Sequence, residues 1–453
     1  MITVVIIIFI VGYLAIVFEH PLKLDKTVPA LIMGALAWAA IAVGHLDVVG
    51  AGHGHGDAHV EEVLLHHIGK IAEILIFLIG AMTIVELVDL HKGFDVITNK
   101  ITTNSKKKML WLVCILAFFL SATLDNLAST IVLVSLLRRL IPLKKERLWF
   151  VCLAVIAANA GGAWSPIGDV TTTMLWIGAK VSTTGLITKL VLPSIVCILV
   201  PLLIASNLKI FKGNITTLEK ETNTGEKKAI AGYSSLMLFV GVGGLVFVPI
   251  FKTVTHLPPY VGMMLALGVV WLVSEYIHPD EDFGGQGGGH LSSAHNALSR
   301  IEMSSILFFL GILVAVTALE SVAVMGTSGE MVGLLKSVAE KLQAAIPNQN
   351  IVIIVLGFLS ALIDNVPLVA ASMGMYEAPM DSSLWHFIAY SAGTGGSMLI
   401  IGSAAGVAAM GMEKINFIWY LKNIAWLALV GFLAGAAVFL LMESMGIGTI
   451  ATG

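Results

Sequence analysis

The chain has 453 residues, of which 57 % are hydrophobic and only 12 % are Asp, Glu, Lys or Arg, and its formal net charge is −3. Soluble domains usually carry about 25 % charged residues, so this composition excludes a soluble enzyme and a disordered protein. The near-neutral charge gives no sign of nucleic acid binding. The composition instead predicts an all-α polytopic protein in a lipid bilayer. The three cysteines all lie in apolar runs, and we expect them to be core residues.

Apolar segments recur along the whole chain and predict its membrane helices. The first lacks the basic region and cleavage site of a signal peptide, so we expect it to be a span. Two of the segments have about 33 residues, and a straight helix of that length rises about 50 Å, whereas the bilayer core is about 30 Å thick. These two must therefore fold back or break. The predicted segments are 1–18, 27–44, 68–90, 109–141, 148–180, 186–206, 231–251, 259–276, 301–320, 351–376, 384–412 and 417–441.

Lysine and arginine placement indicates how the long segments fold. Basic residues cluster on both sides of 109–141, which places both flanks in the cytoplasm. This segment is therefore predicted to be a re-entrant hairpin that enters from inside, with Asp125 and Asn126 at its tip. The segment 351–376 has flanks without Lys or Arg, which predicts a hairpin from the outside with Asp364 and Asn365 at its tip. Five crossings plus one hairpin in each half then place the N- and C-termini outside and invert the second half.

An internal repeat supports this division. S-A-x-x-D-N occurs at 121–126 and again at 360–365, and a Gly-Gly pair is followed six residues later by another Gly in both halves. Inverted repeats with broken helices are typical of secondary transporters. We therefore predict a first repeat over 1–212 and an inverted second repeat over 231–453. Each has a hairpin (109–141; 351–376), a broken helix (148–180; 384–412) and a further span (186–206; 417–441).

The broken helices carry polar, glycine-rich stretches at 159–173 and 391–406. Glycine and proline permit an unwound turn, and unwound backbone is tolerated in a membrane only where it is buried in protein or lines a cavity. Two hairpin tips and two broken helices should therefore meet at one depth.

Three carboxylates fall at this inferred depth with no Lys or Arg nearby in the sequence, namely Asp125, Asp169 and Asp364. A charge there costs about 2.5–3.5 kcal/mol, so such a carboxylate favours either a proton or a bound cation. This alternative is the basis of a cation/proton exchanger. The Asp and Asn residues could also simply cap helices, and the threonines at 171 and 172 could bond to their own helix.

The two S-A-x-x-D-N motifs and N-A-G-G-A-W-S-P-I-G-D-V-T-T at 159–172 resemble NhaD-type sodium/proton antiporters of the ion transporter superfamily. The resemblance covers nearly the whole chain. It implies a homodimer in the bacterial inner membrane that exports Na⁺ or Li⁺ against H⁺, without a cofactor and without enzymatic activity. The family's cation- and proton-binding positions fall on Glu73, Asp125, Asn126, Asn159, Asp169, Thr171, Thr172, Ser360, Asp364, Asn365 and Ser397, and the expected Na⁺ ligands are Asp125, Asn126, Asp364 and Asn365.

Two alternatives share this fold, an arsenite permease and a sodium-coupled dicarboxylate symporter. Aspartate at both hairpin tips would repel a dicarboxylate, and the cysteine placement gives no thiol site for arsenite. Three other segments carry weaker expectations. Residues 45–67 are predicted to be a flexible, histidine-rich outer loop, 278–290 a glycine-rich cytoplasmic linker, and 329–346 an amphipathic helix at the outer surface.

Overall fold

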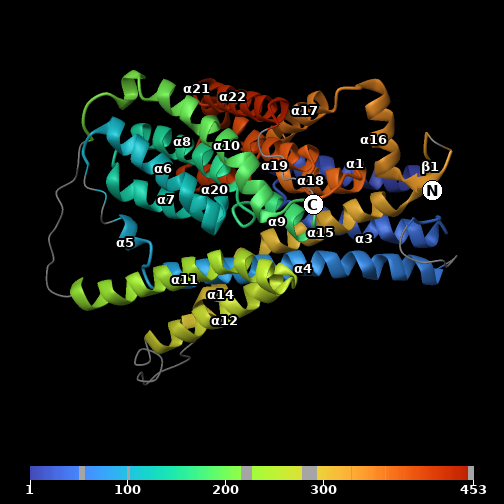
Figure 1. Ribbon diagram of the computed structural model, residues 1–453, viewed down its shortest axis with the longest axis horizontal. Coiled ribbons are helices and arrows are strands. Elements are labelled where there is room, and N and C mark those ends of the chain that lie inside the picture. Colours follow the sequence, from blue (N-terminus) through green and yellow to red (C-terminus); the bar gives the residue numbers. More distant parts are fainter. Residues whose placement is uncertain are drawn as a thin grey trace.

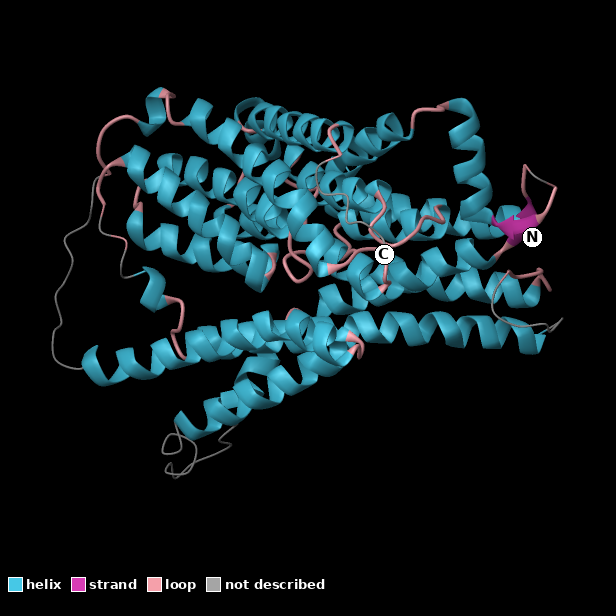
Figure 2. Cartoon of the chain, viewed as in Figure 1, coloured by secondary structure: helices cyan, strands magenta, loops and turns pink. Residues whose placement is uncertain are grey.

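The structure is a computed structural model that describes residues 1–49, 57–98, 101, 103–215, 227–277, 293–327, 329–362 and 364–446. The described chain is almost entirely helical (Figure 2). Its one described sheet is short and antiparallel, with β1 (Ala323–Met325) paired to β2 (Met331–Gly333) so that Val324 lies opposite Val332. The predicted linker 278–290, like His53 and His55 of the histidine-rich loop, lies outside the described residues.

Seven of the described helices are long and apolar enough to cross a membrane, which confirms a multi-pass membrane protein. They are α4 (Asp57–Leu90), α6 (Lys106–Leu124), α10 (Thr183–Ala205), α11 (Lys227–Thr255), α12 (Pro259–Ile277), α15 (Met303–Ser321) and α22 (Ala425–Ser444). Shorter apolar helices are α1 (Ile2–Val17), α3 (Thr27–Val43) and α18 (Asn365–Met375). The connecting helices are α2 (Glu19–Leu22), α5 (Asp95–Thr98), η1 (Lys209–Phe211), α14 (Ser293–Arg300) and α21 (Phe417–Asn423).

Both predicted hairpins are present as pairs of helices that contact each other. The first consists of α6 and α7 (Asn126–Leu140), which lie side by side in Figure 1 and are separated by Asp125 alone. The second consists of α17 (Gln349–Leu362) and α18, which meet at Asp364. The polar D-N pair therefore interrupts an apolar helix in each repeat.

Both predicted broken helices are also present. In the first repeat α8 (Lys144–Gly162) and α9 (Val170–Ile177) flank an unwound segment at 163–169. In the second, α19 (Ser383–Gly395) and η2 (Gly396–Met398) precede an unwound segment at 399–403 and then α20 (Ala404–Glu413). The non-helical segments are shorter than the polar stretches, because the first residues of each stretch continue the preceding helix while it packs against the neighbouring hairpin.

The same backbone contacts recur in the two repeats. Gly161 of α8 approaches the carbonyl of Phe118, and Gly395 of α19 approaches the carbonyl of Gly357, so a side chain on either glycine would overlap the hairpin backbone. The second glycine of each pair is packed in the same way against the later glycine that follows it six residues on. The Gly-Gly…Gly spacing is therefore set by close packing of each broken helix.

The remaining helices form a scaffold in which helices of each half pack against helices of the other half. Helices α1 and α3 of the first half pack together, and α3 packs against α15 of the second half. Correspondingly, α11 and α12 of the second half pack against α4 of the first. Gly34 and Gly311 allow the backbones of α3 and α15 to approach closely. The halves are therefore intertwined, and the boundary between residues 212 and 231 stays a prediction.

Three segments differ from their predicted extent or continuity. The predicted outer loop 45–67 is partly helical, because α4 begins at Asp57 and buries Val63 against Trp38 and Ala318. The predicted amphipathic helix 329–346 is α16 (Leu334–Ala345), since β2 precedes it. The last span is interrupted at Ile424, between α21 and α22.

Gly395→Ala should weaken the packing of α19 against α17, because its Cβ would overlap the Gly357 carbonyl. Overpacking of this kind costs about 1–3 kcal/mol, so we expect a lower melting temperature in detergent. Gly268→Ala in α12 is the matched control, because a Cβ at that position meets no atom within 4 Å. An equal melting temperature for both variants would contradict the packing account.

Candidate functional site

Asp169 lies at the centre of the polar region, directly before α9, and is 2 % exposed. Its Oδ1 accepts a hydrogen bond from the backbone N–H of Thr171 at 3.1 Å. Its Oδ2 accepts the side-chain amide of Asn126 at 3.1 Å and that of Asn365 at 3.2 Å. The two asparagines come from the tips of opposite hairpins. One carboxylate from the first repeat therefore contacts both re-entrant hairpins.

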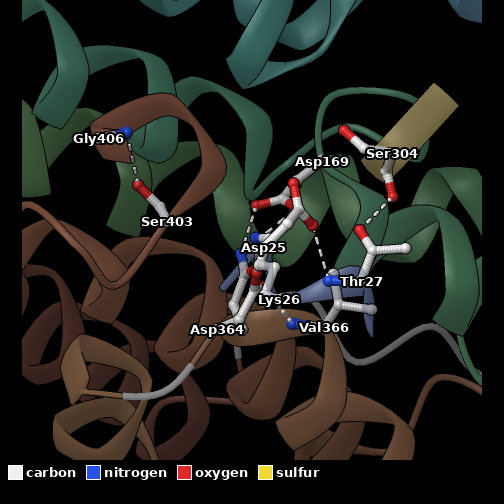
Figure 3. Close-up of polar contacts among 10 residues, drawn as sticks. Asp25, Lys26, Thr27, Asp169, Ser304, Asp364, Val366, Ser403 and Gly406 are labelled. Atoms are coloured by element: carbon white, nitrogen blue, oxygen red, sulfur yellow. Dashed lines mark hydrogen bonds and ion pairs between the residues drawn. The ribbon is translucent and has the colours of Figure 1, made fainter. Parts of the chain in front are cut away.

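Asn159 of α8 extends this cluster toward the second broken helix. Its Oδ1 accepts the amide of Asn126 at 3.0 Å, and its Nδ2 donates to Ser397 Oγ at 2.8 Å and Ser403 Oγ at 2.9 Å. Ser403 is the capping residue of α20 and accepts the backbone N–H of Gly406 at 3.1 Å (Figure 3). Ser403 was missed from the sequence, although the glycine spacing places it in the position that Asp169 has in the first repeat.

The other predicted hydroxyl groups divide into two kinds. Thr172 Oγ1 donates to the Asp169 carbonyl at 2.9 Å, and Ser360 Oγ donates to the Ala392 carbonyl at 2.7 Å. Both hydroxyls therefore donate to backbone carbonyls, and for Thr172 this matches the alternative that it bonds to its own chain segment. Thr171 differs, because its buried Oγ1 makes no hydrogen bond to a backbone carbonyl among the described residues. Its side chain instead interacts with the Asp169 carboxylate and places an oxygen beside it.

Asp125 forms the tip of the first hairpin. Its Oδ1 accepts the N–H of Ala128 at 2.7 Å and thereby caps α7. Its backbone has φ 77° and ψ 165°, a conformation that costs a residue with a Cβ about 1–3 kcal/mol. Asp125 also lines a cavity of about 160 Å³, whose other charged lining residues are Glu86, Asp89, Asp95, Arg139, Arg300 and Glu302. In the described part of the chain, neither Asp125 nor Asp169 forms an ion pair.

Asp364 is the corresponding residue of the second hairpin, and its surroundings differ. Its Oδ1 accepts the N–H of Val366 at 3.2 Å, which caps α18. Its Oδ2 accepts a hydrogen bond from Lys26 Nζ at 2.9 Å (Figure 3). No lysine or arginine lies near Asp364 in the sequence, but the fold brings Lys26 to it. Because Lys26 is 338 residues away along the chain, only the fold shows this pairing.

Glu73 lies in the interior of α4, because that helix begins earlier than predicted. Its charge interacts with Lys252 of α11, whose Nζ donates to the Trp176 carbonyl at 2.8 Å. Among the described residues, Glu73 makes no hydrogen bond to Asp169 or to the two hairpin asparagines. Glu73, like Asp125, Asp364 and Ser360, is therefore not joined to the central cluster by a hydrogen bond among the described residues.

The elements around Asp169 are tied together at both ends by charged groups. At one end, Glu413 of α20 binds Arg138 of α7 at 2.6 Å and Arg147 of α8 at 3.0 Å, and its side chain is 1 % exposed. At the other end, Asp381 accepts the N–H of Ser182 at 2.7 Å and faces His386 Nε2 at 3.3 Å.

Burial raises the pKa of Asp381, but the interactions with His386 and Ser182 outweigh burial and lower it to about 2. The Asp381 carboxylate therefore stays charged at physiological pH.

Glu413 and Asp381 both belong to the second repeat, and each contacts residues of the first repeat. Together these two groups hold segments of the two repeats against each other.

The chemistry of the cluster suits a small hard cation. Oxygen ligands for such a cation are available from the Asp169 carboxylate, the side-chain amides of Asn126, Asn159 and Asn365, and the Thr171 hydroxyl. Amide groups exchange oxygen for nitrogen by a flip of the side chain, so the asparagines can donate to an unoccupied carboxylate or present oxygen to a cation. The cluster therefore provides a carboxylate for one positive charge and several neutral oxygen ligands.

Comparisons with known proteins agree on a transporter. A protein-family model described as "Citrate transporter" (CitMHS) matches residues 13–386. "Sodium/proton antiporter 2" of Arabidopsis thaliana is 43 % identical over 443 residues, which are 96 % of this chain and 98 % of that protein. "Sodium/proton antiporter 1" of the same plant is 45 % identical, with 96 % of this chain and 72 % of that protein covered.

More distant matches extend the comparison to bacteria. "Na(+)/H(+) antiporter NhaD" of Vibrio cholerae is 29 % identical and covers 96 % of this chain and 91 % of that protein. Among solved structures, the Alcanivorax borkumensis YdaH transporter superposes with a TM-score of 0.59 over 93 % of this chain and 99 % of that chain. At 14 % identity, this match shows a shared fold.

Glu413→Gln should loosen the contact between the two repeats. Removing the charge leaves Arg147, whose side chain is 13 % exposed, without its carboxylate, and breaking a buried pair costs about 3 kcal/mol or more. We expect a clear loss of thermal stability in detergent. Glu377→Gln is the control, because the Glu377 side chain is 77 % exposed in its pair with Lys336 and such pairs contribute under about 1 kcal/mol. Equal effects of the two changes would contradict this role of Glu413.

Proposed function

The chain belongs to the citrate transporter family and is homologous over nearly its whole length to NhaD-type antiporters of the ion transporter superfamily, and we propose that it exports Na⁺ or Li⁺ in exchange for H⁺. The observation that carries this proposal is the buried carboxylate of Asp169, which both hairpins contact through asparagine amides. The proposed activity is secondary transport rather than catalysis.

A buried carboxylate surrounded by neutral groups favours a proton or a cation, because a bare charge in low dielectric is costly. When Na⁺ occupies the cluster, Asp169 supplies the charge while Asn126, Asn159, Asn365 and Thr171 supply neutral oxygens. When Na⁺ leaves, a proton on the carboxylate removes the unfavourable charge. Because one carboxylate cannot hold both ions at once, cation release on one side is coupled to proton uptake there.

Asp125 and Asp364 are proposed to complete the pathway on the two sides of Asp169. Each caps the second helix of its hairpin and therefore lies at the point where the hairpin meets the centre. Asp125 lines the cavity, whereas Asp364 forms an ion pair with Lys26. If the basic flanks of the first hairpin are cytoplasmic, this arrangement represents an inward-open state. The four central elements then move against the scaffold to expose the other side.

A citrate or other dicarboxylate is a less suitable substrate, although the family is described as citrate transporters. Anions bind where helix N-termini present free N–H groups. Here Asp125, Asp169 and Asp364 already cap α7, α9 and α18, so carboxylates occupy those positions. An incoming anion would meet negative charge at each of them. Arsenite is not excluded by charge, so transport assays must include it.

The protein is further proposed to be a homodimer of a bacterial inner membrane, with both termini outside. The distribution of basic residues supports this orientation, and the resemblance to NhaD-type antiporters supports the dimer. Since the relatives include plant antiporters, the type of membrane is part of the proposal.

Asp125→Ala and Asp364→Ala should each abolish Na⁺-induced proton movement in everted vesicles that carry a pH-sensitive dye. The reason is that each change removes the carboxylate that guides the cation on one side of Asp169. The wild-type protein should respond to Na⁺ or Li⁺ but not to succinate or arsenite. Asp47→Ala, which changes an exposed residue, is the control. Full activity in both hairpin variants would rule out these residues as part of the pathway.

The proposed orientation can be tested with a membrane-impermeant thiol reagent. The native cysteines Cys114, Cys152 and Cys197 are buried, so they give a low background. Lys107→Cys, next to the first hairpin, should be labelled only from the cytoplasmic side. Lys336→Cys on α16 should be labelled only from the outside. The reverse pattern would invert the assignment of inside and outside.

A further inference from the structure

Lys26 is the only described lysine or arginine that pairs with one of the three central aspartates. Its Nζ lies 2.9 Å from Asp364 Oδ2, and the two side chains are 22 % and 13 % exposed. The same ammonium lies 4.4 Å from the centre of the Phe308 ring in α15, a cation–π contact that favours a positive charge at this point. Figure 3 shows Lys26 next to Asp364.

The backbone that carries Lys26 is anchored to the scaffold. Lys26 directly precedes α3, which packs against α15. The neighbouring Thr27 donates its hydroxyl to the Ser304 carbonyl at 2.9 Å, and its N–H is capped by Asp25 at 2.8 Å (Figure 3). Asp364 belongs to the second hairpin, which contacts the broken helices and also packs against α15 through α18. The ion pair therefore joins the scaffold to the unit that is proposed to move.

The two repeats differ at this point. Asp364 is paired with an ammonium, whereas Asp125, its counterpart, faces the cavity and pairs with no described lysine or arginine. Glu19 and Glu302 also act electrostatically on Lys26. In the described part of the chain, the tip of the second hairpin is thus paired with a lysine ammonium and the tip of the first is not.

We propose that Lys26 is a tethered cation that competes with the transported cation for Asp364. This inference rests on the proposed function and names a residue that sets the apparent affinity for the cation. Lys26 is a positioning residue, because it acts through Asp364. In the state described here the ammonium takes the place of Na⁺ at Asp364. Movement of the hairpin away from α3 separates the pair and leaves Asp364 free for Na⁺, and the return of Lys26 displaces the cation.

Competition predicts a specific change in transport. Lys26→Met keeps the length and apolar stem of the side chain but removes the charge. Without the competitor, Na⁺ should bind Asp364 more readily, and its release should be slower. We expect the Na⁺ concentration for half-maximal exchange to fall about tenfold at alkaline pH, where protons compete least, together with a lower maximal rate.

The experiment compares Lys26→Met, Lys26→Arg and Lys23→Met in everted vesicles. Lys26→Arg keeps the charge and should retain a half-saturating Na⁺ concentration close to that of the wild type. Lys23→Met removes an exposed lysine from the same connecting segment and controls for net charge. An unchanged or raised half-saturating Na⁺ concentration in Lys26→Met would overturn the proposal, because a competitor that is removed must improve binding.

A second measurement uses the unmodified protein in case Lys26→Met does not fold. Acetylation of Lys26, quantified by mass spectrometry, should increase when Na⁺ is added and remain unchanged with choline, because Na⁺ displaces the ammonium from Asp364. Equal acetylation under both conditions would contradict competition. A wild-type protein without Na⁺-dependent proton movement would contradict the antiport function itself. A working wild type with an unaffected Lys26→Met would contradict only the role of Lys26.

Discussion

A carboxylate inside a bilayer needs a compensating partner in every state of a transport cycle, and the rest of this structure depends on how that need is met. Asp169 is 2 % exposed, and side-chain amides from both hairpins contact it. Amides reduce the cost of burial but leave the charge in place. The remaining charge is what allows the same group to hold a proton or a cation. The hairpins, the broken helices and their clamps at Glu413 and Asp381 all serve to bring these partners together.

The fold is symmetric, but the chemistry at its centre is not. Equivalent glycines pack equivalent hairpins in the two repeats. However, the second repeat has Ser403 where the first has Asp169, and Gly393 where the first has Asn159. The single central carboxylate and its polar ligands therefore come largely from one repeat, while the other contributes small groups and leaves room. Asp125 and Asp364 also differ from each other, because among the described residues a lysine pairs with Asp364 and none pairs with Asp125.

Much of this architecture could be predicted from the sequence because polar residues in apolar segments are costly and therefore informative. The motifs at 121–126 and 360–365 located both hairpin tips, and the glycine pairs located both broken helices. Asp169, Asn126, Asn159, Asn365 and Ser397 are joined as one hydrogen-bonded cluster. The role of Lys26 could not be predicted from the sequence, because Lys26 and Asp364 are 338 residues apart and meet only when α3 packs against α15 of the other half. The helical part of 45–67 was missed because its apolar contacts are with distant helices.

Direct binding of Na⁺ tests the role of Asp169 most closely, because it does not depend on transport. Purified wild-type protein should bind radioactive ²²Na⁺ saturably, and Asp169→Asn should lose this binding while keeping its melting temperature. Asparagine has nearly the same shape as aspartate, so the difference reports the charge. Binding of ²²Na⁺ by Asp169→Asn with unchanged affinity would contradict the account that this carboxylate holds the transported cation.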